Sequence, residues 1–178
     1  MSVRLVIIGP PGAGKSSVGT LLAHELHTTL RDTDTDVEEV AGKSIADIFI
    51  EDGEDHFRHL EHEAVLRALA EHDGILALGG GAVVHDGTRD ALRQAPVVFL
   101  DVSMAKAMPR VGLSAPRPLL IGSPRARWKQ LMDARRHRYE EVADLVIDTD
   151  DRSVEELAAK IAHSLSGGEL HTHDGERP

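Results

Sequence analysis

The chain has 178 residues, 41% hydrophobic and 3% aromatic, so we expect one domain with an aliphatic core. Its formal net charge of −10 argues against a general nucleic-acid binder, whose surface is normally basic. It has no cysteine, which excludes disulfides, and no stretch approaches the roughly 20 apolar residues of a membrane span. The first strand begins almost at the N-terminus, so we expect no signal peptide. We therefore expect a cytoplasmic monomer that binds neither nucleic acid nor a membrane.

Short apolar runs with the length of buried strands alternate along the chain with segments of helical periodicity. The runs occupy residues 5–8, 28–30, 75–78, 97–100 and 145–147, and the second is the weakest. Alternation of strands and helices is typical of a doubly wound parallel sheet. We predict an α/β fold with one folded domain over residues 1–165.

Directly after the first run, the residues Gly9-Pro10-Pro11-Gly12-Ala13-Gly14-Lys15-Ser16 match the phosphate-binding loop pattern G-x-x-x-x-G-K-[ST]. Glycines let several backbone N–H groups point at one anion, and a helix expected over residues 16–26 adds the positive end of its dipole. In such loops the lysine reaches the β- and γ-phosphates and the serine hydroxyl binds Mg²⁺. An ordinary glycine-rich turn would not need strand, loop and helix in register. The chain is predicted to bind a nucleoside triphosphate.

Alternating acids follow the second run, at Asp32, Asp34 and Asp36. In a parallel α/β sheet, ligands bind outside the carboxyl ends of the strands, so we expect the loop 32–36 to face the phosphate loop. One carboxylate there can hold Mg²⁺, and another can accept a proton from an acceptor hydroxyl. Helix capping is the alternative, but three acids are more than a cap needs.

A short helix capped by Ser44 is expected to reach residue 49, and a longer one is expected over residues 53–70. On the longer helix, Arg58 and Glu61 have the spacing of a routine surface pair. Gly79-Gly80-Gly81 follows the third run, where the backbone could approach a ligand closely, although a tight turn would also use glycine.

Basic residues dominate residues 106–138, where Asp133 is the only acid, and they suggest a focused anion site. Inside this stretch, residues 112–124 are too rich in glycine and proline to be regular. A lid there carrying Arg117 would exclude water from a triphosphate. Ser153 and Glu156 form a capping box that opens the last helix. Residues 166–178 are expected to form a disordered polar tail with too few apolar side chains to pack.

Together these motifs resemble shikimate kinase in order and spacing over roughly residues 3–165. The resemblance is carried by the phosphate loop, Asp32-Thr33-Asp34, Ser44-Ile45-Ala46-Asp47-Ile48-Phe49, Gly53-Glu54 with Phe57-Arg58, Gly79-Gly80-Gly81 and Arg117-Pro118-Leu119-Leu120. It implies a P-loop NTPase fold like that of nucleoside monophosphate kinases, with five parallel strands and a mobile lid over about residues 112–124. It also implies transfer of the γ-phosphoryl group of ATP to the 3-hydroxyl of shikimate with one Mg²⁺ ion, on the route to chorismate and aromatic amino acids.

The resemblance further implies a role for each matching residue. Catalysis would use Lys15, Asp34 and Arg117, with Asp34 as the base for the reacting hydroxyl. ATP would contact Gly12, Ala13, Gly14, Lys15, Ser16, Ser17, Arg110, Arg117 and Arg152. Shikimate would contact Asp34, Arg58, Gly79, Gly80, Gly81 and Arg135. The metal would be held by Ser16 directly and by Asp32 through water.

The second clamp on the shikimate carboxylate is found by counting back four residues from Tyr139, which selects Arg135. Because His137-Arg138 replaces the family's Pro-Leu before that tyrosine, Arg136 stays open as the alternative. Pro109 is expected to disturb the helical turn that presents Arg110.

Gluconate and nucleoside monophosphate kinases share the strand-loop-helix core, but the aspartate loop, Arg58 and the glycine triplet argue against both. A GTPase is excluded because the chain has no asparagine for its guanine motif. A catalytically silent binding module should have lost Lys15, Asp34 or Arg117, and all three are present. The histidines at 56, 59 and 62 drift around their helix, so we expect a solvated face rather than a metal site.

Overall fold

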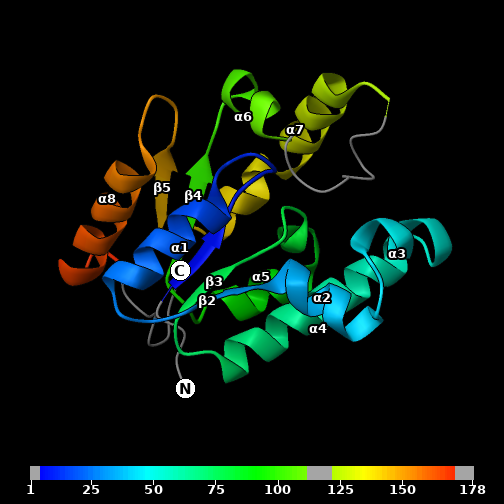
Figure 1. Ribbon diagram of the computed structural model, residues 1–178, viewed down its shortest axis with the longest axis horizontal. Helices are drawn as coiled ribbons and strands as arrows, with labels where there is room; N and C mark the ends of the chain where they lie inside the picture. The colour runs from blue at the N-terminus through cyan, green and yellow to red at the C-terminus, as the bar shows by residue number, and fades with distance from the viewer. Residues whose placement is uncertain (1–4, 112–121, 171–178) are drawn as a thin grey trace.

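The computed structural model describes residues 5–111 and 122–170, and its strands form one parallel sheet in the order β2-β3-β1-β4-β5 (Figure 1). The strands are β1 (Leu5–Ile8), β2 (Leu30–Asp32), β3 (Ile75–Ala77), β4 (Val97–Asp101) and β5 (Leu145–Asp148). The predicted α/β class and five-stranded parallel sheet are confirmed. The weak second run was placed two residues early, because the backbone N–H of Thr28 still bonds to the Ala23 carbonyl at the end of the preceding helix (2.8 Å).

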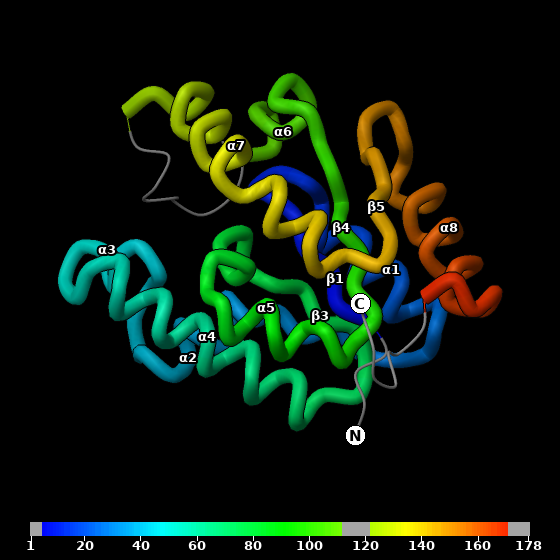
Figure 2. Tube along the Cα trace, turned by 180° about the vertical axis from the view of Figure 1, so that it is seen from behind, coloured from blue at the N-terminus to red at the C-terminus, as the bar shows by residue number. Residues whose placement is uncertain are grey.

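Helices cover both faces of the sheet. They are α1 (Lys15–Glu25), α2 (Thr33–Ala41), α3 (Ile45–Glu51), α4 (Glu54–Glu71), the 3₁₀ turn η1 (Ala82–Val84), α5 (Asp86–Leu92), α6 (Met104–Val111), α7 (Pro124–Val142) and α8 (Val154–Ser166). Helices α1 and α8 pack together on the face turned to the viewer in Figure 1. Helices α4, α5 and α7 lie in front of the sheet in the reverse view of Figure 2. In the described part of the chain, no helix is both long and apolar enough to cross a membrane.

The apolar side chains gather in two clusters. The larger one surrounds the sheet, where β1 is buried along its whole length, as expected for a central parallel strand covered on both faces. A second, smaller cluster joins α2, α3 and α4 beyond the edge strand β2, and its buried members are Val37, Ile48, Phe57 and Ala64. The elements that follow β2 therefore have a small core of their own.

Local signals in the sequence fix several helix ends. The Ser44 hydroxyl accepts a hydrogen bond from the Asp47 backbone N–H (3.1 Å), and Ser153 and Glu156 form the predicted capping box at the start of α8. Helix α8 continues through Ser166, and Leu170 packs into the large core with 6% exposure. The expected disorder is therefore wrong for residues 166–170, because Leu170 anchors this segment to the sheet cluster although Ser166, Gly167 and Glu169 are exposed. Residues 171–178 and most of the expected lid, 112–121, lie outside the described residues.

Three connections leave the carboxyl ends of neighbouring strands at one edge of the sheet. The phosphate loop follows β1, helix α2 follows β2 directly, and Gly79-Gly80-Gly81 follows β3. Parallel strands place such connections side by side, and this is where ligands bind in open α/β sheets.

Candidate active site

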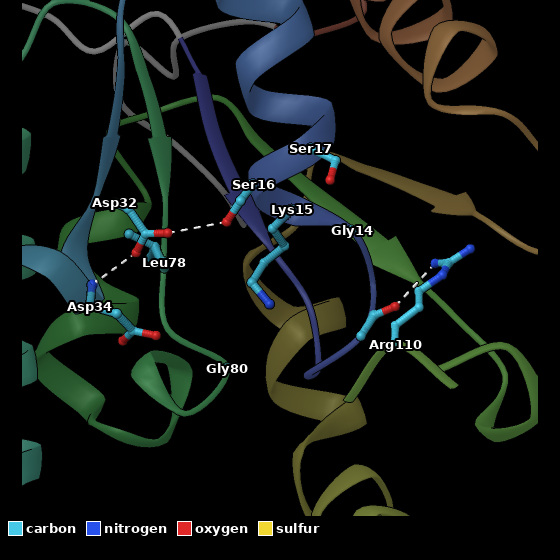
Figure 3. A pocket seen from close by; sticks show the side chains of 10 residues that line it. Gly14, Lys15, Ser16, Ser17, Asp32, Asp34, Leu78, Gly80 and Arg110 are labelled. Atoms are coloured by element: carbon cyan, nitrogen blue, oxygen red, sulfur yellow. Dashed lines mark hydrogen bonds between the residues drawn. The ribbon is translucent and has the colours of Figure 1, made fainter. Parts of the chain in front are cut away.

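The phosphate loop turns tightly between β1 and α1. Gly12 and Gly14 have φ values of 84° and 88°, a left-handed conformation that favours glycine. The Lys15 ammonium donates hydrogen bonds to the carbonyls of Gly9 (2.8 Å) and Pro10 (3.1 Å). Its side chain projects into the space between the loop and Asp34 (Figure 3). Loop and helix are therefore built as the motif predicted.

Asp32 connects the phosphate loop with helix α2. One of its carboxylate oxygens accepts a hydrogen bond from the Ser16 hydroxyl (3.2 Å), and the other accepts one from the Asp34 backbone N–H (3.0 Å). The expected loop 32–36 is thus the first turn of α2, and Asp32 is its N-cap, so the capping alternative holds for this residue. Asp36 instead pairs with Arg31 (2.7 Å), which supports the alignment at Asp32 and Asp34.

The oxygens of Ser16 and Asp32 suit a hard divalent cation. Mg²⁺ bound with a nucleotide takes one or two protein oxygens and fills its octahedron with phosphates and water. In residues 5–111 and 122–170, no group of three or more His, Asp or Glu side chains is arranged to hold a metal ion by itself. The oxygens of Ser16 and Asp32 therefore fit a metal that also binds phosphate.

A cavity of about 380 Å³ opens between the phosphate loop and the start of α2. Figure 3 shows the side chains around it. Its lining residues are Gly12, Gly14, Lys15, Ser16, Ser17, Asp32, Asp34, Leu78, Gly80 and Arg110. It thus brings together residues predicted for the nucleotide, the metal and the acceptor.

The glycine triplet after β3 lies against charged side chains. A Cβ added at Gly79 would come within 2.5 Å of Asp34 Oδ1 and 2.7 Å of Glu61 Oε1, and one at Gly81 would overlap the Arg58 guanidinium. The Gly79 N–H donates to the Thr33 hydroxyl (3.3 Å), which ties this turn to α2. Close approach of side chains, rather than the turn alone, therefore requires glycine here.

Arg58 and Glu61 pair as their spacing predicted, with 2.5 Å between Nη1 and Oε2. The pair is not on the surface, because the side chains are 13% and 3% exposed. Burial raises the pKa of the Glu61 carboxyl, although the Arg58 cation opposes that shift. A buried carboxylate of this kind orients the guanidinium that carries its countercharge.

Arg135 and Arg136 point in different directions from helix α7. Arg135 is buried and donates to the Gly80 carbonyl (3.2 Å), whereas Arg136 holds both carboxylate oxygens of Asp101 at the end of β4 (2.7 and 3.0 Å). Burial is the main cause of the lowered pKa of Arg135; Tyr139 raises this pKa and the Arg58 cation lowers it. Arginine stays protonated in proteins. Two cations thus lie near one another beside the glycine triplet, and this geometry favours Arg135 over Arg136 as a carboxylate clamp.

The predicted nucleotide arginines have three different outcomes. Arg110 donates to the Gly12 carbonyl (3.1 Å) and lines the cavity, and helix α6 continues through Pro109 to Val111, so the helix does not end at this proline. Arg152 is exposed in the connection between β5 and α8 and does not line the cavity. Arg117 lies outside the described residues and stays a prediction.

The histidines on α4 do not all lie on the solvated face expected for them, because His62 packs against other side chains. Its Nδ1 lies 2.8 Å from the buried Thr88 hydroxyl, and its ring stacks on His85 with 3.9 Å between centroids. Burial and the neighbouring His85 lower the pKa of His62.

Sequence reasoning missed two side chains that hold the site from helix α7. The Tyr139 hydroxyl donates to the Gly80 carbonyl, and burial raises its pKa to about 12. Trp128 donates from Nε1 to the Pro11 carbonyl (3.0 Å). The spacing of Trp128, Met132, Arg135 and Tyr139 is that of one helix face, and all four are buried. This helical periodicity in the sequence was the signal that could have identified Trp128 and Tyr139 as buried side chains on the face of α7 that carries Arg135.

Comparisons with known proteins agree with this site. The family model described as shikimate kinase matches residues 11–166. A shikimate kinase of Streptomyces avermitilis is 50% identical over 91% of this chain and 95% of the relative, and one of Saccharopolyspora erythraea is 52% identical over 93% and 95%.

Solved structures agree as well. Shikimate kinase from Acinetobacter baumannii in complex with shikimate has a TM-score of 0.88 and 32% identity, covering 94% of each chain. A gluconokinase from Sinorhizobium meliloti has a TM-score of 0.61 at 18% identity, covering 94% of this chain and 93% of the other, and so shares the fold alone. The family match over most of the chain and the identities near one half show that this protein belongs to the shikimate kinase family.

Proposed function

We propose that this protein transfers the γ-phosphoryl group of ATP to the 3-hydroxyl of shikimate, giving shikimate 3-phosphate and ADP on the route to aromatic amino acids. Family membership supports the reaction. The observation that carries it is the single cavity that holds both Lys15 and Asp34, from connections after two different strands. Phosphoryl transfer depends mainly on positioning and on charge stabilisation, and such a cavity suits both needs.

On the nucleotide side, the phosphates bind the loop from Gly12 to Ser17, where backbone N–H groups and the start of α1 favour an anion. Lys15 stabilises the charge that develops on the transferred group. Arg110 lies next to this loop through its bond to the Gly12 carbonyl and is suited to stack on the base. Arg117 and Arg152 complete the nucleotide contacts in this proposal.

On the acceptor side, Asp34 binds the reacting hydroxyl and takes its proton. The guanidinium groups of Arg58 and Arg135 bind the shikimate carboxylate, each with planar donors that suit a carboxylate. The backbone from Gly79 to Gly81 lies between them and contacts the ring of the substrate. Glu61 keeps Arg58 oriented through their 2.5 Å ion pair.

The metal in this proposal is one Mg²⁺ ion that binds with ATP, held by the Ser16 hydroxyl and, through water, by Asp32. When bound, it neutralises phosphate charge. The hydrogen bond between Ser16 and Asp32 (3.2 Å) supports this choice, because it brings two oxygen ligands together at the loop. We further propose a cytoplasmic monomer with no nucleic-acid or membrane partner.

The direct test is release of ADP, followed by a coupled assay with shikimate, gluconate or AMP as acceptor. Release should depend on both shikimate and Mg²⁺ and should be negligible with the other two acceptors. AMP has no carboxylate for the two clamps, and the open chain of gluconate does not hold a hydroxyl at a fixed distance from its carboxylate as the ring of shikimate does. Equal activity with gluconate and shikimate would overturn the assignment. Omitting the acceptor gives the background rate of ATP hydrolysis.

A further inference from the structure

The carbonyls of the phosphate loop accept hydrogen bonds from side chains of three helices. Lys15 of α1 donates to Gly9 and Pro10, and Arg110 of α6 donates to Gly12 (3.1 Å). The carbonyl between them, that of Pro11, accepts the indole N–H of Trp128 from α7 (3.0 Å). Trp128 is 4% exposed, so this bond is shielded from water.

The Pro11 bond fixes the orientation of one peptide group. All peptide bonds in the described residues are trans. In a trans peptide the carbonyl and the following N–H point in opposite directions. Trp128 therefore draws the Pro11 oxygen toward α7 and turns the Gly12 N–H the other way. Gly12 lines the cavity, and as a glycine with a φ of 84° it has intrinsic access to backbone conformations that other residues rarely adopt.

The same face of α7 also bonds to the glycine triplet Gly79-Gly80-Gly81, which we call the acceptor loop. Arg135 and Tyr139 both donate to the Gly80 carbonyl, two and three turns beyond Trp128. The two loops touch, because a Cβ added at Gly80 would meet Pro11 Cδ at 3.1 Å. One rigid helix thus bonds to a carbonyl in each ligand loop.

We propose that Trp128 is a positioning residue for phosphoryl transfer: its indole N–H holds the Pro11–Gly12 peptide in the orientation that binds phosphate, in register with the acceptor loop on the same helix. This role rests on the proposed function, since it concerns how the phosphate loop is presented to a nucleotide. Trp128 itself touches neither substrate, and it acts through the Pro11 carbonyl.

Loss of the hydrogen bond from Trp128 to the Pro11 carbonyl should weaken nucleotide binding more than acceptor binding. A net hydrogen bond of about 1 kcal/mol corresponds to about a fivefold change in the ratio of the competent loop to other orientations, so MgADP affinity falls by as much as about fivefold. Shikimate alone should bind unchanged, because Arg135 and Tyr139 still hold Gly80. A general loss of packing would not separate the two ligands in this way.

The experiment compares Trp128→Phe with Met132→Ala by calorimetric titration with MgADP and, separately, with shikimate. Both substitutions remove the same number of non-hydrogen atoms from the buried face of α7, but only the first removes a donor to the loop. Trp128→Phe should bind MgADP up to about fivefold more weakly than the parent and more weakly than Met132→Ala, which stays within about twofold of the parent. MgADP affinity equal to the parent in Trp128→Phe, or an equal loss in both variants, overturns the proposal.

The native protein provides a second measurement that does not depend on a folded variant. Trp128 is the only tryptophan in the chain, so its emission reports on the indole bonded to the loop. Titration with MgADP should change that emission with the dissociation constant found by calorimetry, and an unchanged emission at saturation would overturn the role of Trp128. If the native protein binds no MgADP at all, the proposed function fails instead.

Discussion

Replacing Arg135 and Arg136 in turn should separate substrate binding from helix anchoring. Arg135 as a whole is 6% exposed, and Arg135→Ala removes a guanidinium bonded to the Gly80 carbonyl in the acceptor loop. Arg136→Ala removes an ion pair with Asp101 in which the arginine side chain is 43% exposed. Along a helix, adjacent residues differ by about 100° in direction, so one arginine cannot replace the other.

The structure sets the size of each effect. A hydrogen bond to a charged group contributes about 1.5–3 kcal/mol, so the shikimate dissociation constant of Arg135→Ala should rise about 10- to 150-fold. An exposed ion pair contributes about 0.2–1 kcal/mol, which would appear mainly as a lower melting temperature in Arg136→Ala. Arg135→Lys keeps the charge but loses the planar fork, and it should remain well below the parent in affinity.

Calorimetric titration with shikimate gives the dissociation constant of all three variants. Titration with MgADP serves as the control, because Arg135 lies on the acceptor side of the site and its loss should leave nucleotide binding unchanged. Thermal unfolding shows whether each variant is folded. If Arg136→Ala weakens shikimate binding more than Arg135→Ala does, then the burial and direction of these side chains have been misread.

Four further changes have sharp expected outcomes. Lys15→Met should abolish turnover with little change in melting temperature; activity within about tenfold of the parent would contradict its role in charge stabilisation. Asp34→Asn should lower kcat by about 10²–10⁴ if the carboxylate takes a proton, whereas a change confined to the KM for shikimate would refute that. Gly81→Ala should displace the Arg58 guanidinium and weaken shikimate binding about tenfold while leaving MgADP binding intact, as paired titrations would show. The folded pKa of Glu61 is raised above the ordinary 4.5, so its contribution to stability is present below that pH and is lost as pH rises through the folded value. Denaturant titrations over roughly pH 4–8 should therefore show the parent losing stability relative to Glu61→Gln, and parallel curves would count against the raised pKa.

The sequence was most informative where the structure is local. The phosphate loop from Gly9 to Ser16 needs a strand, a turn and a helix within a few residues, and all three have strong local signals. Counting four residues back from Tyr139 identified the buried Arg135, because that spacing keeps both on one helix face. Family membership, predicted from the combined motifs, is confirmed.

What the sequence could not show depends on packing between distant segments. Glu61 has the spacing of a surface pair, and its burial follows only from the close approach of the glycine triplet to α4. Leu170 stands alone in a polar segment, so its contact with the sheet core has no local signal. The bond from Trp128 to Pro11 joins residues 117 positions apart, which no short motif records.

The small core formed by Val37, Ile48, Phe57 and Ala64 has a consequence for the dynamics of the acceptor side. Four buried side chains offset little of the conformational entropy of α2 and α3, whereas the sheet is supported by a much larger cluster. Amide hydrogens in α2 and α3 should therefore exchange with solvent through local opening, whereas those of β1 should exchange only through global unfolding. Asp34 on α2 and Arg58 on α4 both belong to this unit, whereas Arg135 lies on α7 and bonds to the Gly80 carbonyl after β3. An acceptor held by all three, as proposed, would therefore bridge the unit to the sheet. Shikimate bound in the proposed way would stabilise these helices against local opening, and its measured affinity would include the free energy of closing them.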